Sequence, residues 1–319
     1  MRRILFVVGA CLFLLSLSGR QSHAQPKAGA ILIADEPDYW GFIWEEMQAM
    51  RADVMKFHLS YDHHWEGGMP AHFVIPSAHL QGAISNGATD LIVRTAETHI
   101  TAKEVRHFVE GMTFFDTGER LVDFIYNNRD KVHVWIEVGN EPDQHRADPW
   151  VHRYNLIDTW NQLKPQWEWL WNMHWIASAP LACSGTYTDV FYHKNHEGSV
   201  QDKYEAIGVH EYGDFNFDFK CTDRAKREIS SGHSIWVTEA GINHDYDWAQ
   251  KGRRYRNALS ARGWPVRGWT FFLLTKVGAY PWNHCPTSDG NCHRYAMDLH
   301  YNSDVPVPGR PAATELGKR

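Results

Sequence analysis

Hydrophobic and β-branched residues occur in short runs along this chain, and each run is followed by turn residues and then by a helical pattern of apolar positions. We interpret these runs as buried strands at residues 30–34, 54–59, 91–95, 132–138, 175–180, 206–211, 235–238 and 266–274. The fifth run has an alternative, because Trp175, Ile176 and Ala177 could extend the preceding helix. A short helix at residues 310–316 would close the chain.

Eight strand-then-helix units predict an α/β fold, a single (β/α)8 TIM barrel, rather than an open doubly wound sheet. The carboxyl ends of the strands meet at one mouth of such a barrel, and the chemistry of barrel enzymes lies there. Residues 25–319 fit the roughly 250 residues plus insertions of one barrel. No Gly/Ser linker or internal repeat divides the chain, so we expect one catalytic domain.

The first 24 residues read as a signal peptide and not as part of the fold. Arg2 and Arg3 precede an apolar run that begins at Ile4, and Ser22-His23-Ala24 is a small-x-small cleavage site. The run of about 15 residues is short for a membrane span, which needs about 20. We therefore expect residues 25–319 to be secreted or periplasmic and free of the membrane after cleavage. An uncleaved anchor is the alternative.

Export changes how the cysteines are interpreted. Cleavage leaves Cys183, Cys221, Cys285 and Cys292, an even number in an oxidising compartment. Cys285 and Cys292 bracket a polar loop and look like a local disulfide. That pairing leaves Cys183 with Cys221, which would join the loops after two successive strands. Three pairings are formally possible, and free thiols remain an alternative.

Two of the predicted strands lead into a motif that places a glutamate at the strand tip. Residues 132–138 lead into Gly139-Asn140-Glu141-Pro142, and residues 235–238 lead directly into Glu239, 98 residues after Glu141. Either glutamate alone could be a solvated surface residue or a charge at a helix N-terminus. Two of them at one barrel mouth are what glycoside hydrolysis requires, one as proton donor and one as nucleophile or base.

A third glutamate is expected below this mouth. Side chains alternate along a strand, so Glu137 points into the barrel together with Glu141. A buried carboxylate has to be paired, and Lys56 and Arg94 on the second and third strands are the candidate partners. We interpret Glu137 as one half of a structural ion pair.

The sixth strand ends in His210-Glu211-Tyr212. His210 and Tyr212 share a face, and Glu211 points away from it. Tyr212 could donate a hydrogen bond to Glu239 and keep that carboxylate ionised, while His210 could bind a sugar hydroxyl.

The tryptophans fall into two groups. Large aromatic rings pack on the faces of sugars, and one group follows predicted strands on the side of the mouth. It comprises Trp40, Trp65, Trp150, Trp248 and Trp282. The other group has helical spacing, and we predict that it packs a helix against the barrel without touching substrate. It comprises Trp160, Trp167, Trp169, Trp171 and Trp175.

Charge and motifs argue against several other functions. The formal charge is −6, and cleavage would remove three arginines and no acid, giving −9, so a nucleic-acid partner is not expected. The first strand has no His-x-His and the chain has no HExxH, so we interpret the 20 histidines as surface or hydrogen-bonded residues and expect no metal. A glycine-rich phosphate loop is also absent. We expect a monomer without a cofactor.

The strand-end motifs resemble those of glycoside hydrolase clan A, the retaining (β/α)8-barrel glycosidases that include families 5 and 39. Residues 137–142 are similar to the clan's acid/base strand, residues 237–241 to its nucleophile strand and residues 210–212 to its His-x-Tyr. The resemblance implies that Glu141 is the acid/base and Glu239 the nucleophile. It also implies that Asn140 binds the sugar 2-hydroxyl, that Tyr212 and Arg94 orient Glu239, and that His210 lines the pocket.

Two positions depart from the clan pattern. Members often carry a tryptophan at the end of strand eight, whereas here Trp269 falls early in the strand. Trp282 would take that place from the loop, or the subsite is built differently. The arginine usual near the end of the second strand is replaced by His58, which would face the substrate.

The resemblance and the residues together predict a retaining endo-β-glycanase that cuts a polysaccharide or oligosaccharide in a groove lined by loop tryptophans such as Trp40 and Trp65. An exo-acting β-glycosidase is the nearest alternative. A non-catalytic carbohydrate-binding barrel and a metal-dependent hydrolase are the others.

Overall fold

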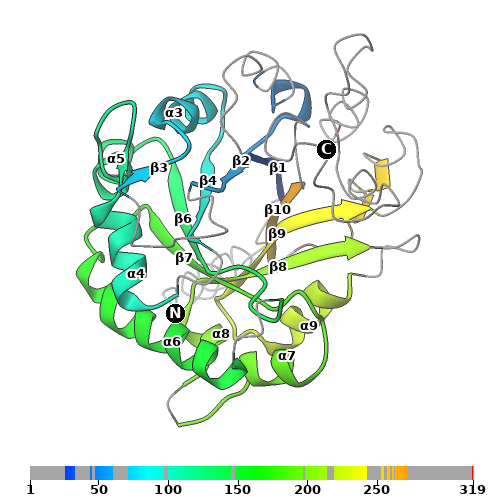
Figure 1. The fold of residues 1–319 in the computed structure, drawn as a ribbon. Coiled ribbons are helices and arrows are strands. Elements are labelled where there is room, and N and C mark those ends of the chain that lie inside the picture. Colours follow the sequence, from blue (N-terminus) through cyan, green and yellow to red (C-terminus); the bar gives the residue numbers. More distant parts are fainter. Residues whose placement is uncertain are drawn as a thin grey trace, which may run out of the picture.

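Figure 1 shows the computed structural model of the protein. It describes residues 26–32, 44, 47–59, 71–96, 100–144, 148–196, 198–213, 219–242 and 265–271, with a few positions between 253 and 263 and position 318. The predicted signal peptide at residues 1–24 and the predicted helix at residues 310–316 lie outside this part of the chain. No helix in the described part is long and apolar enough to cross a bilayer.

Eight parallel strands close into a barrel, as predicted. In their order around the barrel they are β1 (Lys27–Leu32), β2 (Val54–Phe57), β4 (Asp90–Arg94), β6 (His133–Val138), β7 (Met173–Ser178), β8 (Ala206–Gly213), β9 (Ser234–Ile242) and β10 (Val266–Phe271), which pairs with β1 again. All eight predicted runs are strands, with ends that differ by a few residues. Trp175 lies inside β7, so the helical alternative for this run is excluded.

Helices surround the barrel (Figure 1). Those with described bounds are α3 (Ser77–Ser85), α4 (Ala102–Arg106), α5 (Leu121–Asn127), α6 (Pro149–Leu163), α7 (Thr186–Phe191), α8 (Val200–Lys203) and α9 (Lys220–Glu228). A π-helical turn, His107–Gly111, follows α4, and a 3-10 turn, Lys164–Gln166, follows α6. The short strands β3 (His72–Phe73) and β5 (Thr113–Phe114) form a separate pair.

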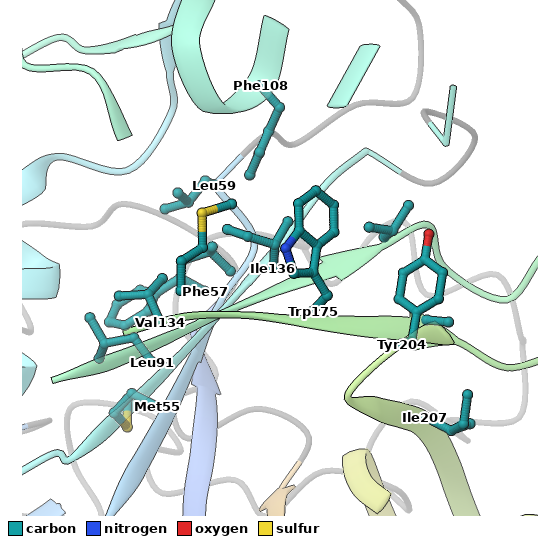
Figure 2. Packing of buried hydrophobic residues seen from close by; sticks show 14 of the residues in the cluster. Met55, Phe57, Leu59, Leu91, Phe108, Val134, Ile136, Trp175, Tyr204 and Ile207 are labelled. Carbon is teal, nitrogen blue, oxygen red and sulfur yellow. The ribbon is translucent and has the colours of Figure 1, made fainter. Parts of the chain in front are cut away.

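The two faces of the barrel wall have different partners. Outward-facing side chains such as Phe57, Val134 and Ile136 belong to the large core between the strands and the helices (Figure 2). Inward-facing residues form a second cluster, which consists of Val54, Ile92, Trp135, Ile176, Ala206 and Trp236. This alternation is the period of two that a strand imposes, and it fills the barrel below the mouth.

The second tryptophan group does not form the helical stripe that its spacing suggested. Only Trp160 lies in α6, because the helix ends at Leu163 and Pro165 lacks the N–H that would continue it. Trp167 is buried and stacks on Trp175 of β7, with ring centroids 5.6 Å apart. The other two members, Trp169 and Trp171, are 57% and 54% exposed.

Cys183 and Cys221 form a disulfide, as predicted. It joins the loop after β7 to the first turn of α9, over a sequence separation of 38 residues. Closing a loop of this length is worth about 4 kcal/mol through the entropy of the unfolded chain. Cys285 and Cys292 lie outside the described residues, so their pairing stays a prediction.

We predict that acidification below about pH 6.5 destabilises the fold. Burial lowers the pKa of His79 in α3 and His152 in α6 to about 4 and that of His174 on β7 to about 3. Between those values and the ordinary histidine pKa, the unfolded chain binds protons that the folded chain does not. Stability is therefore complete above about pH 6.5 and falls below it, by at most about 1.4 kcal/mol per pH unit for each histidine.

The measurement is the urea midpoint between about pH 7 and pH 5, a window above the titration of ordinary carboxylates. His152→Gln should flatten the slope, because residue 152 then no longer takes up a proton on unfolding. A midpoint that stays constant across the window in the natural protein would contradict the prediction.

Candidate active site

The mouth of the barrel gathers polar side chains from five strands and the residues that follow them. They come from β2 (Lys56 and His58), β4 (Arg94), β6 (Glu137, Asn140 and Glu141), β8 (His210) and β9 (Glu239). All of these except Glu141 are buried. The strand ends predicted to carry the chemistry thus bring their side chains together.

Glu239 reaches the barrel interior through an irregularity in β9. Val209 pairs with Val237, but His210 pairs with Glu239, so β9 has one extra residue at Thr238. Val237 belongs to the outer core, and strict alternation would place Glu239 on that outer face as well. The bulge instead lets Glu239 contact Lys56 from the inside of the barrel.

Three nitrogen-bearing side chains surround one oxygen of Glu239. Lys56 Nζ donates to Oε1 at 3.2 Å, Arg94 Nη1 lies 3.5 Å from it and His58 Nε2 lies 3.6 Å from it. Burial by itself raises the pKa of this carboxyl, but the charges of His210, Lys56 and Arg94 outweigh it and hold the pKa well below its usual range. Glu239 is therefore a buried carboxylate that is ionised at neutral pH.

His58 contributes no charge of its own to this cluster. Burial lowers its pKa well below the ordinary histidine value, and the neighbouring charges of Arg94 and Lys56 lower it further. Beside Lys56, a second cation near Glu239 is Arg94 on β4, the third strand of the barrel. Arg94 was expected beside Glu239, and the structure places it there.

Lys56 joins two carboxylates. Its ammonium lies 2.7 Å from Glu137 Oε2 as well as 3.2 Å from Glu239 Oε1, and the side chains of Lys56 and Glu137 are wholly buried. This confirms the ion pair predicted for Glu137 and selects Lys56 as the partner. The contact between Lys56 and Glu239 was not anticipated. The inward position of Lys56, two residues before His58 on the same face, was the available signal.

Glu141 lies past the end of β6 in an unusual backbone conformation. Its φ is +36°, and Gly139 just before it has a φ of +80°. Gln144 N donates to Glu141 O at 2.9 Å, which makes residues 141–144 a turn. The Glu141 side chain is 20% exposed, so it faces the open mouth, whereas that of Glu239 is 4% exposed.

His210 lies between the two glutamates. Its Nδ1 is 2.6 Å from Glu141 Oε1 and 3.5 Å from Glu239 Oε2. Burial by itself lowers the pKa of His210, but the charge of Glu239 and the hydrogen bond with Glu141 outweigh it and raise the pKa above the ordinary value. One oxygen of each glutamate and a ring nitrogen of His210 all lie within 4.8 Å of one another.

That triad has the residue types of a metal site, but its surroundings oppose a cation. Lys56 and Arg94 place positive charge within 3.5 Å of Glu239 and would repel a metal ion there. The other described cluster of possible ligands, Cys183, Cys221 and Glu211, has its sulfurs in the disulfide. The arrangement favours acid–base and nucleophilic chemistry by carboxyl groups.

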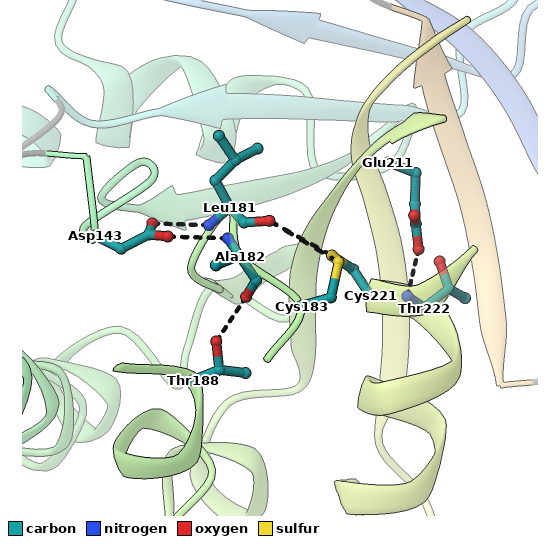
Figure 3. The surroundings of a disulfide bond; sticks show 8 residues. All are labelled: Asp143, Leu181, Ala182, Cys183, Thr188, Glu211, Cys221 and Thr222. Atoms are coloured by element: carbon teal, nitrogen blue, oxygen red, sulfur yellow. Dashed lines mark hydrogen bonds between the residues drawn. A yellow bond between two sulfur atoms is a disulfide. The ribbon is translucent and has the colours of Figure 1, made fainter. Parts of the chain in front are cut away.

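Asn140 is buried beside Glu141, and its Oδ1 has no hydrogen-bond partner among the described residues. Glu211 points away from His210, as predicted, and accepts a hydrogen bond from Thr222 N (Figure 3). The backbone of Tyr212 is part of β8, but its side chain lies outside the described part of the structure.

Four of the five predicted mouth tryptophans, Trp40, Trp65, Trp248 and Trp282, also lie outside the described residues, so their roles remain predictions. The fifth, Trp150, is in the first turn of α6, with the edge of its ring system against His193 at a centroid distance of 5.2 Å. Trp269 is fully buried against Phe219 and belongs to the outer core. It therefore does not line the mouth.

No family model and no curated protein matches the amino-acid sequence. Among solved structures, the chain is similar to a family 39 glycoside hydrolase from Bacteroides cellulosilyticus WH2 (TM-score 0.53, 16% identity, 92% of this chain and 64% of that one). It is also similar to an endo-β-1,4-mannanase from Thermotoga petrophila (0.52, 13%, 92% and 76%) and a GH30 endoxylanase from Clostridium papyrosolvens C71 (0.51, 12%, 93% and 73%).

The chain thus spans less than two thirds of the length of the family 39 enzyme. Identities this low show the fold and leave the activity open. The chain has the closed (β/α)8 barrel that these glycoside hydrolases share.

Proposed function

We propose that the protein is a retaining glycoside hydrolase, an exported endo-β-glycanase that cuts a β-linked polysaccharide by double displacement. The observation that carries the proposal is the pair of glutamates at the barrel mouth, whose nearest ligand oxygens lie within 4.8 Å of each other. Carboxyl groups about 5–5.5 Å apart are typical of retaining enzymes, whereas inverting enzymes need roughly 6.5–9.5 Å to admit a water molecule.

The surroundings of the two glutamates divide the roles between them. Glu239 is buried and ionised, which suits a nucleophile that attacks the anomeric carbon and forms a glycosyl ester. Glu141 is partly exposed at the mouth, where it can protonate the departing oxygen and then take a proton from the incoming water. His210 lies close to both side chains, with one ring nitrogen 2.6 Å from Glu141 Oε1 and 3.5 Å from Glu239 Oε2.

The cations around Glu239 assist both steps. Lys56 and Arg94 keep the carboxylate charged before attack, and they stabilise the same carboxylate when it leaves the glycosyl ester. Asn140 offers a buried side-chain oxygen that has no partner among the described residues, and a sugar 2-hydroxyl could donate to it. No metal or cofactor has a role in this mechanism.

Two further observations support the finer parts of the proposal. The disulfide between Cys183 and Cys221 is typical of an oxidising compartment and supports export. Two of the similar solved structures are an endoxylanase and an endo-β-1,4-mannanase, which supports endo-acting cleavage of a β-linked polymer.

A product analysis tests the proposal. The protein from residue 25 onward is incubated with β-glucans, mannans, xylans and galactans, beside the Glu239→Ala variant. A ladder of oligosaccharides from one polymer, absent with the variant, is the expected result. Release of a single small sugar would show an exo-acting β-glycosidase and not an endo-glycanase. Binding without any product would indicate a carbohydrate-binding barrel.

Glu239→Ala should abolish turnover, because the glycosyl ester can no longer form. Azide should restore part of the activity by entering the vacated space, and the product should be an α-linked glycosyl azide. Nuclear magnetic resonance of the product gives the anomeric configuration. Absence of the α-azide would count against Glu239 as nucleophile.

Glu141→Ala should keep more activity on aryl glycosides with good leaving groups than on natural glycosides, because only poor leaving groups need a proton. General acid catalysis is typically worth about 10²–10⁴-fold, which sets the expected loss on natural substrates. The measurement is kcat/KM for a series of leaving groups. Equal losses across the series would show that Glu141 is not the acid.

Removing the charge of Lys56 should move the acidic limb of kcat/KM to higher pH, by about 1 to 2 units, because Glu239 loses a cation that keeps it ionised. The double variant Lys56→Met/Glu137→Gln removes both charges, so that no buried charge is left unpaired. Glu137→Gln alone is the control and should move the acidic limb of kcat/KM to lower pH, because Lys56 then pairs with Glu239 alone. An acidic limb at the same pH in both variants would refute this role of Lys56.

A further inference from the structure

Glu141 occupies a backbone conformation that its neighbours have to impose. A positive φ is unfavourable for a residue with a Cβ, and a residue before proline favours an extended backbone instead. Such strain persists only where the surroundings over-determine the conformation. The contacts that restrain the turn at residues 141–144 therefore decide where the Glu141 carboxyl lies.

Asp143 provides one of these restraints. Its Oδ1 accepts a hydrogen bond from Leu181 N at 2.8 Å, and its Oδ2 accepts one from Ala182 N at 2.9 Å (Figure 3). Hydrogen bonds to a carboxylate are shorter and stronger than those between neutral groups. Asp143 thus fastens the turn that contains Glu141 to the loop after β7.

The loop after β7 is itself fixed on two further sides. Thr188 Oγ1, in α7, donates to Ala182 O at 2.6 Å. Cys183 is bonded to Cys221 at the start of α9, and the carbonyl oxygen of Leu181 lies 3.5 Å from Cys221 Sγ. The disulfide therefore carries the restraint from the β7 loop to α9.

The chain of contacts then returns to its starting point. Thr222, which follows Cys221, donates its backbone N–H to the buried carboxylate of Glu211. Glu211 is the neighbour of His210 on β8, and His210 Nδ1 lies 2.6 Å from Glu141 Oε1. The residues 141–143, 181–183, 221–222 and 210–211 form a closed circuit of covalent bonds and hydrogen bonds.

We propose that this circuit, which we call the brace, positions Glu141 as the proton donor, with Asp143 and the Cys183–Cys221 disulfide as its positioning elements. The inference rests on the proposed function, because it assigns Glu141 the acid/base role. Glu239 also lies 3.5 Å from His210, but Lys56 and Arg94 hold it inside the barrel, and neither of these two residues belongs to the brace. Loosening the brace therefore impairs proton donation and leaves the nucleophile in place.

Two independent variants open the brace, Asp143→Ala and the double variant Cys183→Ala/Cys221→Ala. Asp148→Ala is the matched control. Asp148 also accepts hydrogen bonds from two successive backbone N–H groups, those of Trp150 and Val151, but it caps α6 and is not part of the brace. Loss of this cap should lower the Tm by itself, so the control reproduces a general loss of stability.

The first measurement is kcat/KM on an alkyl glycoside and on a dinitrophenyl glycoside of the same sugar. Both brace variants should lose about tenfold or more on the alkyl glycoside relative to the dinitrophenyl glycoside, and Asp148→Ala should not change the ratio. Equal losses on the two substrates, or no loss, would overturn the brace as a device for proton donation.

The second measurement needs no turnover. The titration of His210 by nuclear magnetic resonance, assigned with His210→Gln, reports whether Glu141 still contacts the ring. The pKa of His210 should fall in both brace variants, because a contact with Glu141 that raises it is weakened. It should stay unchanged in Asp148→Ala. An unchanged pKa of His210 in the brace variants would overturn this inference, whether or not the natural protein cleaves a glycoside. Absence of any glycoside cleavage by the natural protein would refute the proposed function instead.

Discussion

The ammonium of Lys56 is the interaction on which the mouth depends, because it lies between two buried carboxylates. A buried carboxylate is tolerable only with a partner of opposite charge, and one lysine serves both Glu137 and Glu239. Glu137 stays in contact with Lys56 throughout the proposed cycle, whereas Glu239 would lose its charge on forming an ester. Lys56 therefore keeps Glu137 as a partner at every stage and can stay in one position. The charge of Glu239 thus changes during the proposed cycle, while the contact between Lys56 and Glu137 stays the same.

The two glutamates differ in how the fold restrains them. Glu239 is fixed from below by charges on β2 and β4, within the filled interior of the barrel. Glu141 is fixed from the side by loops, through Asp143, the disulfide and His210. This division suits the proposed roles. A nucleophile needs one position and a constant charge, whereas an acid/base residue has to meet first a departing group and then a water molecule at the open mouth.

The sequence pattern was sufficient for the barrel, because strand-then-helix alternation needs only local periodicity. It also gave Lys56 as one of two candidate partners of Glu137 and favoured the Cys183–Cys221 bond among three possible pairings. It failed where position depends on distant parts of the chain. The helical spacing of the tryptophans was misleading, because Pro165 ends α6 and β7 begins at Met173. The role of Asp143 was not visible either, since its partners are the backbone N–H groups of Leu181 and Ala182, which any residues could provide.

The extra residue in β9 has a consequence for how such enzymes are related to one another. Thr238 is an extra residue in β9 with no partner position in the neighbouring strand β8. The direction of the Glu239 side chain follows from this extra residue and not from the identity of the residues around it. Two chains could share every side chain at this strand end and still differ in chemistry if one lacked the inserted position. Comparisons that match residue types while ignoring strand register would miss that difference. In this barrel, one peptide unit decides whether the carboxylate of Glu239 faces the mouth or the helices outside the barrel.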